Sequence, residues 1–307
     1  MAFKKFKNFT NSGFGSNLSN EGYRLITKNG KFNTRKEGLS FFERFDLFHT
    51  LTHMHPLPFF LLLFTAFISM NLLFTGLYLA VGLSDLQGAT GNNFSDAFFF
   101  SVQTITTVGY GGIHPTGTAL NLIAGTEAFV GLLSFAVATG LLYGRFSRPK
   151  NKLIFSANAL ISPYGEINGL MARVANPKNS QLINAEAKMI FSQVMDDQGA
   201  PTRSFYTLDL ELNHIALFVS SWTIVHPINE DSPLSGATVA DLKARNAELI
   251  LLINAYDETY NQPIHVRTSY KPEEILEKVK FTRILGHNEH GQSTISLNKI
   301  SDYETVE

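Results

Sequence analysis

The 307-residue chain carries 25 Lys and Arg against 26 Asp and Glu, and a net charge of −1 gives no indication of nucleic-acid binding. It has no cysteine, which excludes disulfides and thiolate metal sites. Charged residues make up 17% of the chain, below the ~25% of an average soluble protein, and the deficit is local: residues 47–84 contain no Lys, Arg, Asp or Glu. These numbers favour a membrane part followed by a soluble part.

The first 56 residues divide into two segments. Residues 1–37 are basic but contain no apolar core of the kind that follows the basic start of a signal peptide, so we expect a cytoplasmic N-terminal segment. Residues 38–56 include LSFFERFDLFHTLTHM, which alternates apolar and polar residues at helical spacing. This pattern predicts an amphipathic helix that lies in the plane of the membrane interface.

Two long apolar runs, 58–81 and 119–143, predict transmembrane helices. Each exceeds the roughly 20 residues that a helix needs to cross the hydrocarbon layer. Many Lys and Arg residues precede the first run, a basic cluster follows the second, and none lies between the two. The positive-inside rule therefore places both termini in the cytoplasm and residues 84–118 outside a cell (inner) membrane. The one-sided charge disfavours the alternative, a buried helical hairpin in a soluble protein.

The segment between the two spans contains a short helix. NFSDAFFFSVQTITT has a capping signal at Asn93 or Ser95 and then an apolar run, which predicts a helix over 95–106. That helix is too short to span the membrane, so we expect it to be re-entrant. The non-helical backbone that follows it survives at membrane depth only where it lines water or is buried in protein.

Residues 107–111, TVGYG, form that backbone. TVGYG is itself an established potassium-filter sequence, in which rings of carbonyls replace the hydration shell of K⁺. No GKT or GKS follows it, which disfavours a phosphate-binding loop. One chain supplies a quarter of each ring, so we expect a homotetramer. The predicted filter, with K⁺ as its only ligand and no other cofactor, comprises Thr107, Val108, Gly109, Tyr110 and Gly111.

Residues 153–307 predict a β-sandwich. Short β-rich runs such as LIFSANALI, SFYTLDLEL and ELILLINAYD alternate with turn signals such as SPYGEING and DDQGAP. This arrangement is typical of antiparallel sandwiches. Residues 146–152 are the predicted linker from the pore domain at 57–145.

Several stretches together resemble the inward-rectifier potassium channel family, most closely its prokaryotic branch. They include GRFSRPKNKLIFSANALI, WTIVHPINEDSPLSG and ELILLINAYDETYNQPIHVRTSYKPEEIL, within a resemblance that runs from about residue 38 to 285. The resemblance implies a two-transmembrane-helix potassium pore with a re-entrant pore helix, followed by an immunoglobulin-like cytoplasmic β-sandwich. It implies a channel and no enzyme. The alternative from another class is a membrane-anchored sensor whose pore does not conduct.

The second span contains the predicted cavity and gate. Phe135, Thr139 and Tyr143 are spaced i, i+4 and i+8, so they form one stripe that we expect to face the cavity. Gly140 stands where the family has a glycine that permits bending. Four Tyr143 side chains would make a hydrophobic gate that closes by dewetting. The alternative role for Tyr143 is an aromatic anchor at the membrane interface.

The resemblance also suggests how internal blockers act. Strong rectifiers have an acidic residue where this chain has Phe135, so we expect only weak block by Mg²⁺ or polyamines within the cavity. Glu258 matches an acidic residue of the family's cytoplasmic pore, with Asp257 or Asp197 beside it. The alternative for each carboxylate is a solvated loop position.

Two groups of residues have predicted supporting roles. Glu127 lies inside a span, where a charge is costly, so we expect it to hydrogen-bond the back of the filter. Gln103 takes the place of a family glutamate that braces the filter. Basic residues at the inner surface attract anionic lipid at ~1 kcal/mol each, although topology alone would explain them. The resemblance favours regulation by anionic lipid, with activation and inhibition both left as alternatives. The residues that would bind it are Arg44, Arg145, Arg148, Lys150 and Lys152.

Overall fold

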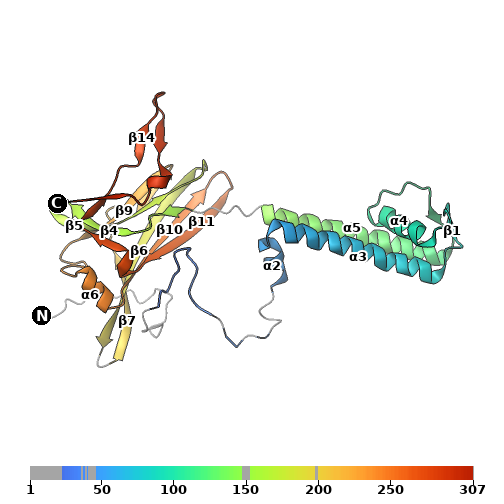
Figure 1. The fold of residues 1–307 in the computed structure, drawn as a ribbon, viewed down its shortest axis with the longest axis horizontal. Helices are drawn as coiled ribbons and strands as arrows, with labels where there is room; N and C mark the ends of the chain where they lie inside the picture. Colours follow the sequence, from blue (N-terminus) through green and yellow to red (C-terminus); the bar gives the residue numbers. More distant parts are fainter. Residues whose placement is uncertain are drawn as a thin grey trace. The chain divides into compact units, whose positions relative to one another are not determined.

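The computed structural model of the chain describes residues 23–35, 37–38, 40, 46–146, 153–197 and 200–306, except for the side chains of residues 196, 197, 200 and 201. The chain divides into two compact units. One unit comprises residues 37–149, and the other combines residues 1–36 with 150–307. The first unit is helical and the second is mostly β-sheet (Figure 1).

Two long helices dominate the first unit. Helix α3 (Pro56–Val81) has a hydropathy of 2.1 and α5 (Thr118–Phe146) one of 1.7, and each is long and apolar enough to cross a membrane. They run alongside each other, and the shorter α4 (Asn93–Ile105) packs against both (Figure 1). Only 17% of the apolar 18-residue stretch of α3 and 11% of that of α5 are buried within the chain. The remaining apolar surface is therefore available to lipid or to other subunits.

The segments on either side of α4 are tied together. Strand β1 (Leu86–Gln87) pairs antiparallel with β2 (His114–Pro115). Gly88 permits this approach, because a Cβ at that position would lie 1.8 Å from the carbonyl oxygen of Gly112. The segment before α4 and the segment after residue 111 are thus paired with each other.

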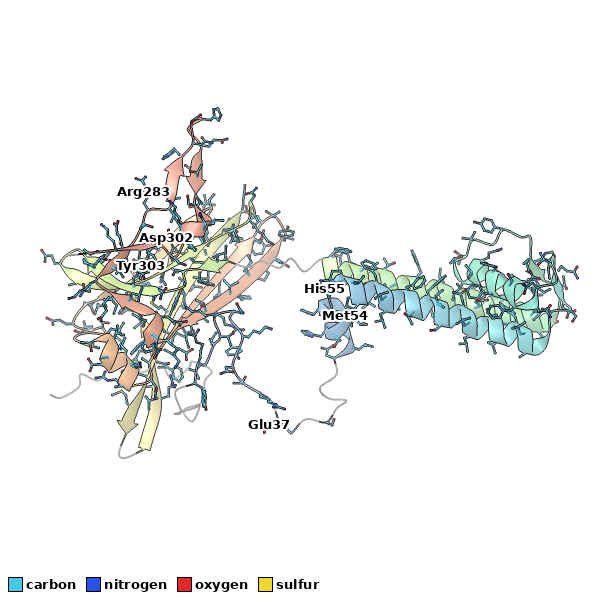
Figure 2. All side chains as sticks on the ribbon, viewed as in Figure 1. Glu37, Met54, His55, Arg283, Asp302 and Tyr303 are labelled. Carbon is cyan, nitrogen blue, oxygen red and sulfur yellow. The ribbon has the colours of Figure 1, made fainter. Side chains whose placement is uncertain are left out.

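The bounds of two short helices differ from the sequence predictions. Helix α2 covers only Leu47–His53; Gly38 and Ser40 are not helical, and residues 41–45 lie outside the described residues. It ends before the junction with α3 at Met54 and His55 (Figure 2), because Pro56 disfavours a helical His55. Helix α4 begins at Asn93, so both predicted caps, Asn93 and Ser95, are wrong. Its cap is Asn92, whose side chain accepts a hydrogen bond from the Ser95 amide.

The β unit is a sandwich of two five-stranded sheets, as predicted. Within each sheet the strands pair antiparallel, except that β12 runs parallel to β4. The first sheet has the order β11 (Gln262–Tyr270), β10 (Glu248–Asp257), β6 (Leu182–Asp197) and β7 (Ala200–Leu208), with β8 (His214–Phe218) also on β6. The second has the order β12 (Ile275–Glu277), β4 (Ala159–Tyr164), β5 (Ile167–Ala175) and β3 (Ile154–Phe155), with β9 (Ser221–Ile228) on β5.

The core lies between the two sheets. Alternate residues of each strand point inward, as the period of two requires. Phe191 and Leu249 of the first sheet meet Val174 and Ile224 of the second in this core. Short elements complete the unit: α6 (Val239–Ala244), η1 (Pro272–Glu274), β13 (Val279–Phe281), β14 (Leu285–His287), β15 (Ser293–Ile295), η2 (Leu297–Lys299) and β16 (Tyr303–Thr305).

The described part of the N-terminal segment packs on this β unit. Leu25 and Ile26 join a second apolar cluster with residues of β6, β7 and β10. Their backbone amides donate to the buried Glu248 carboxylate, at 2.8 Å and 3.1 Å. Residues near Leu25 therefore belong to the β unit, a role that composition alone did not indicate.

Candidate functional site

The TVGYG backbone alternates in the sign of φ. Thr107, Gly109 and Gly111 have φ of 58°, 53° and 78°, whereas Val108 and Tyr110 do not have positive φ. When residues alternate between right- and left-handed conformations, successive amides point to one side and successive carbonyls to the other. The backbone of 107–111 is thus arranged to present a row of carbonyl oxygens.

The amides of this segment are bonded back to helix α4. The Val108 and Gly109 amides both donate to the carbonyl oxygen of Gln103, at 3.0 Å and 3.3 Å, and the Thr107 amide donates to Thr104. These bonds hold Thr107 in a left-handed conformation that is rare for a residue with a Cβ. Gln103 therefore supports the segment through its main chain. A residue type cannot reveal this role, because every residue has a carbonyl.

Glu127 is fully buried between three helices. Tyr78 of α3 donates its phenolic hydrogen to Glu127 Oε2 at 2.5 Å, and the Ser101 hydroxyl of α4 bonds the other carboxylate oxygen. Ser101 Oγ also lies 3.1 Å from Asn71 Oδ1 on α3. These side chains join α3, α4 and α5 into one polar network inside an apolar unit.

The expected hydrogen bond from Glu127 to the filter is wrong for this chain. Its carboxylate oxygens bind α3 and α4, and no hydrogen bond joins it to residues 107–111, all of which the structure describes. Glu127 meets the middle of α4, at Ser101, rather than its end. The roles of Asn71 and Tyr78 were not predicted from the sequence. Their signal is polar residues at helical spacing, Asn71, Thr75 and Tyr78, inside an otherwise apolar span.

Gly131 sets how closely α5 approaches the end of α4. A Cβ on Gly131 would lie 2.3 Å from the carbonyl oxygen of Ile105, a distance that requires the backbone to move. Ile105 is the last residue of α4. The sequence indicated Gly140 and did not distinguish Gly131 from the other glycines of α5.

We expect Gly131→Ala to separate α5 from α4 and to disturb the filter. Overpacking of this kind costs about 1–3 kcal/mol. The measurement is the thermal unfolding midpoint of the purified protein, together with potassium flux from liposomes. Gly125→Ala is the matched control, because it adds the same methyl group to the same helix with no atom within 4 Å. Equal behaviour of the two variants would contradict the close contact.

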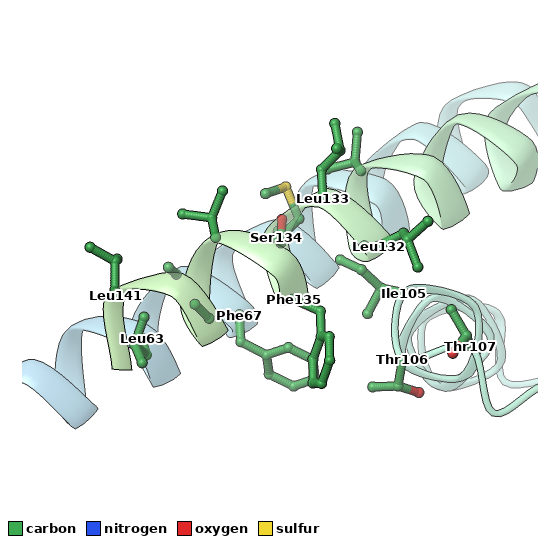
Figure 3. Close-up of a pocket in the computed structure, with 16 residues that line it drawn as sticks. Leu63, Phe67, Ile105, Thr106, Thr107, Leu132, Leu133, Ser134, Phe135 and Leu141 are labelled. Carbon is green, nitrogen blue, oxygen red and sulfur yellow. The ribbon is translucent and has the colours of Figure 1, made fainter. Parts of the chain in front are cut away.

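The predicted stripe on α5 is exposed in the single chain. Phe135 and Tyr143 are each 74% exposed, and the Thr139 hydroxyl donates to the Phe135 carbonyl. An ideal Cβ on Gly140 meets nothing within 4 Å. A largely apolar cavity of about 870 Å³ is lined mainly by residues of α5, among them Phe135, with residues of α3 and residues 105–107 at the end of α4 (Figure 3). The stripe is available for a pore axis.

The predicted acidic pair of the β unit separates in the structure. Glu258 is exposed on the turn between β10 and β11. Asp257 is fully buried, and its Oδ1 accepts from the amides of Thr259 and Tyr260 at 3.0 Å and 3.3 Å. The predicted pore role of Asp257 is therefore wrong, because its carboxylate forms the turn. The side chain of Asp197 lies outside the described residues.

Of the five residues in the predicted basic cluster, the structure describes only Arg145. Its guanidinium donates from Nη1 to the Leu51 carbonyl oxygen at 3.4 Å. Its centre lies 5.0 Å from the centroid of the Phe59 ring. The other four members, Arg44, Arg148, Lys150 and Lys152, lie outside the described residues.

Comparisons with known proteins agree with this geometry. Residues 57–148 match the family model described as "Ion channel", and residues 153–307 match "Inward rectifier potassium channel C-terminal domain". The chain is 32% identical over 286 residues to inward rectifier potassium channel Kirbac3.1 of Paramagnetospirillum magnetotacticum, covering 91% of this chain and 95% of that one. It is 30% identical over 311 residues to G protein-activated inward rectifier potassium channel 4 of Mus musculus, covering 92% and 73%. A human relative, G protein-activated inward rectifier potassium channel 2, is 29% identical over 315 residues, covering 92% and 72%. This chain therefore belongs to the inward-rectifier potassium channel family, a family of membrane channels and not of enzymes.

Proposed function

We propose that four copies of this chain form a potassium-selective pore around an axis lined by residues 107–111. The observation that carries the proposal is the alternating sign of φ along TVGYG, which gives one row of carbonyls per chain. Four rows would replace the hydration shell of K⁺. The C-terminal end of α4 adds a partial negative charge that favours a cation in the cavity below.

The proposed orientation places both termini in the cytoplasm. No Lys or Arg lies between the two spans, and basic residues flank them on the other side. The β-sandwich would then extend the ion pathway inward, with Glu258 as its candidate site for Mg²⁺ or polyamines. The exposure of Glu258 supports this assignment.

The proposed gate is the cytoplasmic end of α5. Tyr143 is largely exposed in the single chain, as a residue that meets its symmetry mates would be. Gly140, one turn before it, allows the helix to bend. Phe135 lies on the same stripe and makes the cavity apolar, so internal block there should be weak. Anionic lipids would act on the gate through the basic residues that follow α5.

Potassium flux from liposomes that contain the purified protein tests the function. We expect K⁺ flux that is blocked by Ba²⁺, little Na⁺ flux, and a chemically crosslinked tetramer. Vesicles with and without anionic lipid test the lipid effect. A monomer in detergent and lipid alike, or equal passage of Na⁺ and K⁺, would contradict the proposal. A tetramer without any flux would instead favour a sensor with a closed pore.

A further inference from the structure

Arg145 stands at the cytoplasmic end of the proposed gate helix and contacts two other helices. Its Nη1 donates to the carbonyl oxygen of Leu51, which lies in the last turn of α2. That carbonyl is one of the four that a helix leaves without an internal partner, so a cation is favourable there. Phe59, whose ring lies under the guanidinium, is fully buried in the first turn of α3.

The neighbouring residue adds a packing contact to the same helix. An ideal Cβ on Gly144 would lie 3.4 Å from Cζ of Phe48 and 3.8 Å from Cγ2 of Thr52, both on α2. These are ordinary van der Waals distances. The last turn of α5 therefore rests directly on α2 at two successive residues.

Neither contact of Arg145 depends on a lipid headgroup. One Arg145 donor bonds the Leu51 carbonyl oxygen and the guanidinium lies over the Phe59 ring, so both contacts are made to the protein itself and need no lipid. The guanidinium is required for this geometry, because a lysine ammonium cannot bond a carbonyl and stack on a ring in the same way. The structure thus gives Arg145 a role that its charge alone does not.

We propose that Arg145 is a positioning residue that fastens the end of the gate helix to the interfacial helix α2 and the start of α3. Movement of α2 is then transmitted to Tyr143, half a turn before Arg145, without lipid between them. This proposal rests on the proposed channel function, since it assigns a coupling role to the end of that gate. This role does not depend on the lipid-binding role that the sequence suggested for Arg145.

The first test compares Arg145→Lys, Phe59→Leu and the double variant by planar-bilayer recording in neutral and in anionic lipid. Arg145→Lys retains the charge, and Phe59→Leu has no charge to lose. We expect each to change open probability about two- to fivefold in the same direction in both lipids. The double variant should change it no more than either single variant. Wild-type behaviour of Arg145→Lys in both lipids, or additive effects, would overturn the proposal.

The second test uses the absence of cysteine in the chain. In a Thr52→Cys/Gly144→Cys variant, we expect oxidation to form a disulfide in the purified protein, measured as lost thiol labelling. Gating should persist after oxidation, because the two residues move together. A failure to crosslink, or gating that stops on oxidation and returns on reduction, would contradict coupled movement. Because crosslinking needs no ion flux, it remains informative even if the protein proves not to conduct.

Discussion

Gly109→Ala is expected to abolish potassium-selective flux. Gly109 has φ of 53°, a left-handed conformation that costs a residue with a Cβ about 1–2 kcal/mol. In a tetramer four such residues meet in one ring, so the total is about 4–8 kcal/mol, or roughly three to six powers of ten in the population of the conducting backbone. The measurement is the ratio of Ba²⁺-sensitive K⁺ flux to Na⁺ flux from liposomes.

Gly82→Ala is the matched control. Gly82 caps α3 with φ of 96°, and an added Cβ meets nothing within 4 Å, as at Gly109. With ψ of 149° Gly82 lies near a region that only glycine adopts readily, so the substitution introduces backbone strain at least as large, away from the filter. We expect the Gly82 variant to conduct selectively. If the Gly109 variant also retained wild-type selectivity, the assignment of its carbonyl to the ion pathway would be wrong.

Glu127→Ala is expected to destabilise the membrane unit and to weaken potassium selectivity. The substitution leaves the buried Tyr78 hydroxyl without its acceptor and leaves the Ser101 hydroxyl with Asn71 as its remaining partner. Each buried polar group that loses its partner costs about 1–3 kcal/mol. Ser101 lies on α4, whose last turn holds the filter amides, so the loss should reach the filter. Thermal unfolding and the K⁺/Na⁺ flux ratio measure the two effects.

Glu127→Gln separates the hydrogen bonds from the carboxylate. Its amide oxygen can accept from Tyr78, and its amide nitrogen can donate to Ser101, whose hydroxyl then donates to Asn71 Oδ1, 3.1 Å away. We expect this variant to lose less than half the stability that the alanine variant loses. Equal losses in both variants, or an alanine variant as stable as wild type, would show that the network does not position α4.

The parts of the molecule that were predicted correctly are those encoded by neighbouring residues. The two spans follow from uninterrupted apolar runs of sufficient length, and the structure has them at Pro56–Val81 and Thr118–Phe146. The sandwich follows from short β-rich runs between turns, and the family membership follows from several separate motifs. The interfacial helix was predicted within 38–56, but α2 covers only Leu47–His53, because an apolar–polar alternation does not show where a helix begins and Pro56 disfavours a helical His55.

The roles that were missed depend on residues far apart in the chain. Asp257 and Glu258 are adjacent carboxylates that the sequence does not distinguish. In the structure Asp257 is buried and accepts two hydrogen bonds from turn amides, so its carboxylate does not face solvent. Gly131 is one of several glycines in its helix, and only its distance from Ile105 distinguishes it.

The amino-acid sequence by itself determined that the chain has two spans long enough to cross a membrane, a TVGYG segment between them and a β-sandwich after them. Each of these follows from hydropathy, periodicity or a contiguous motif. Only the tertiary structure decided which groups join the helices: Ser101 and Tyr78 meet Glu127, and Leu51 meets Arg145. The physical reason is that a hydrogen bond depends on distance and direction in space, and the packing of α2, α3, α4 and α5 sets both.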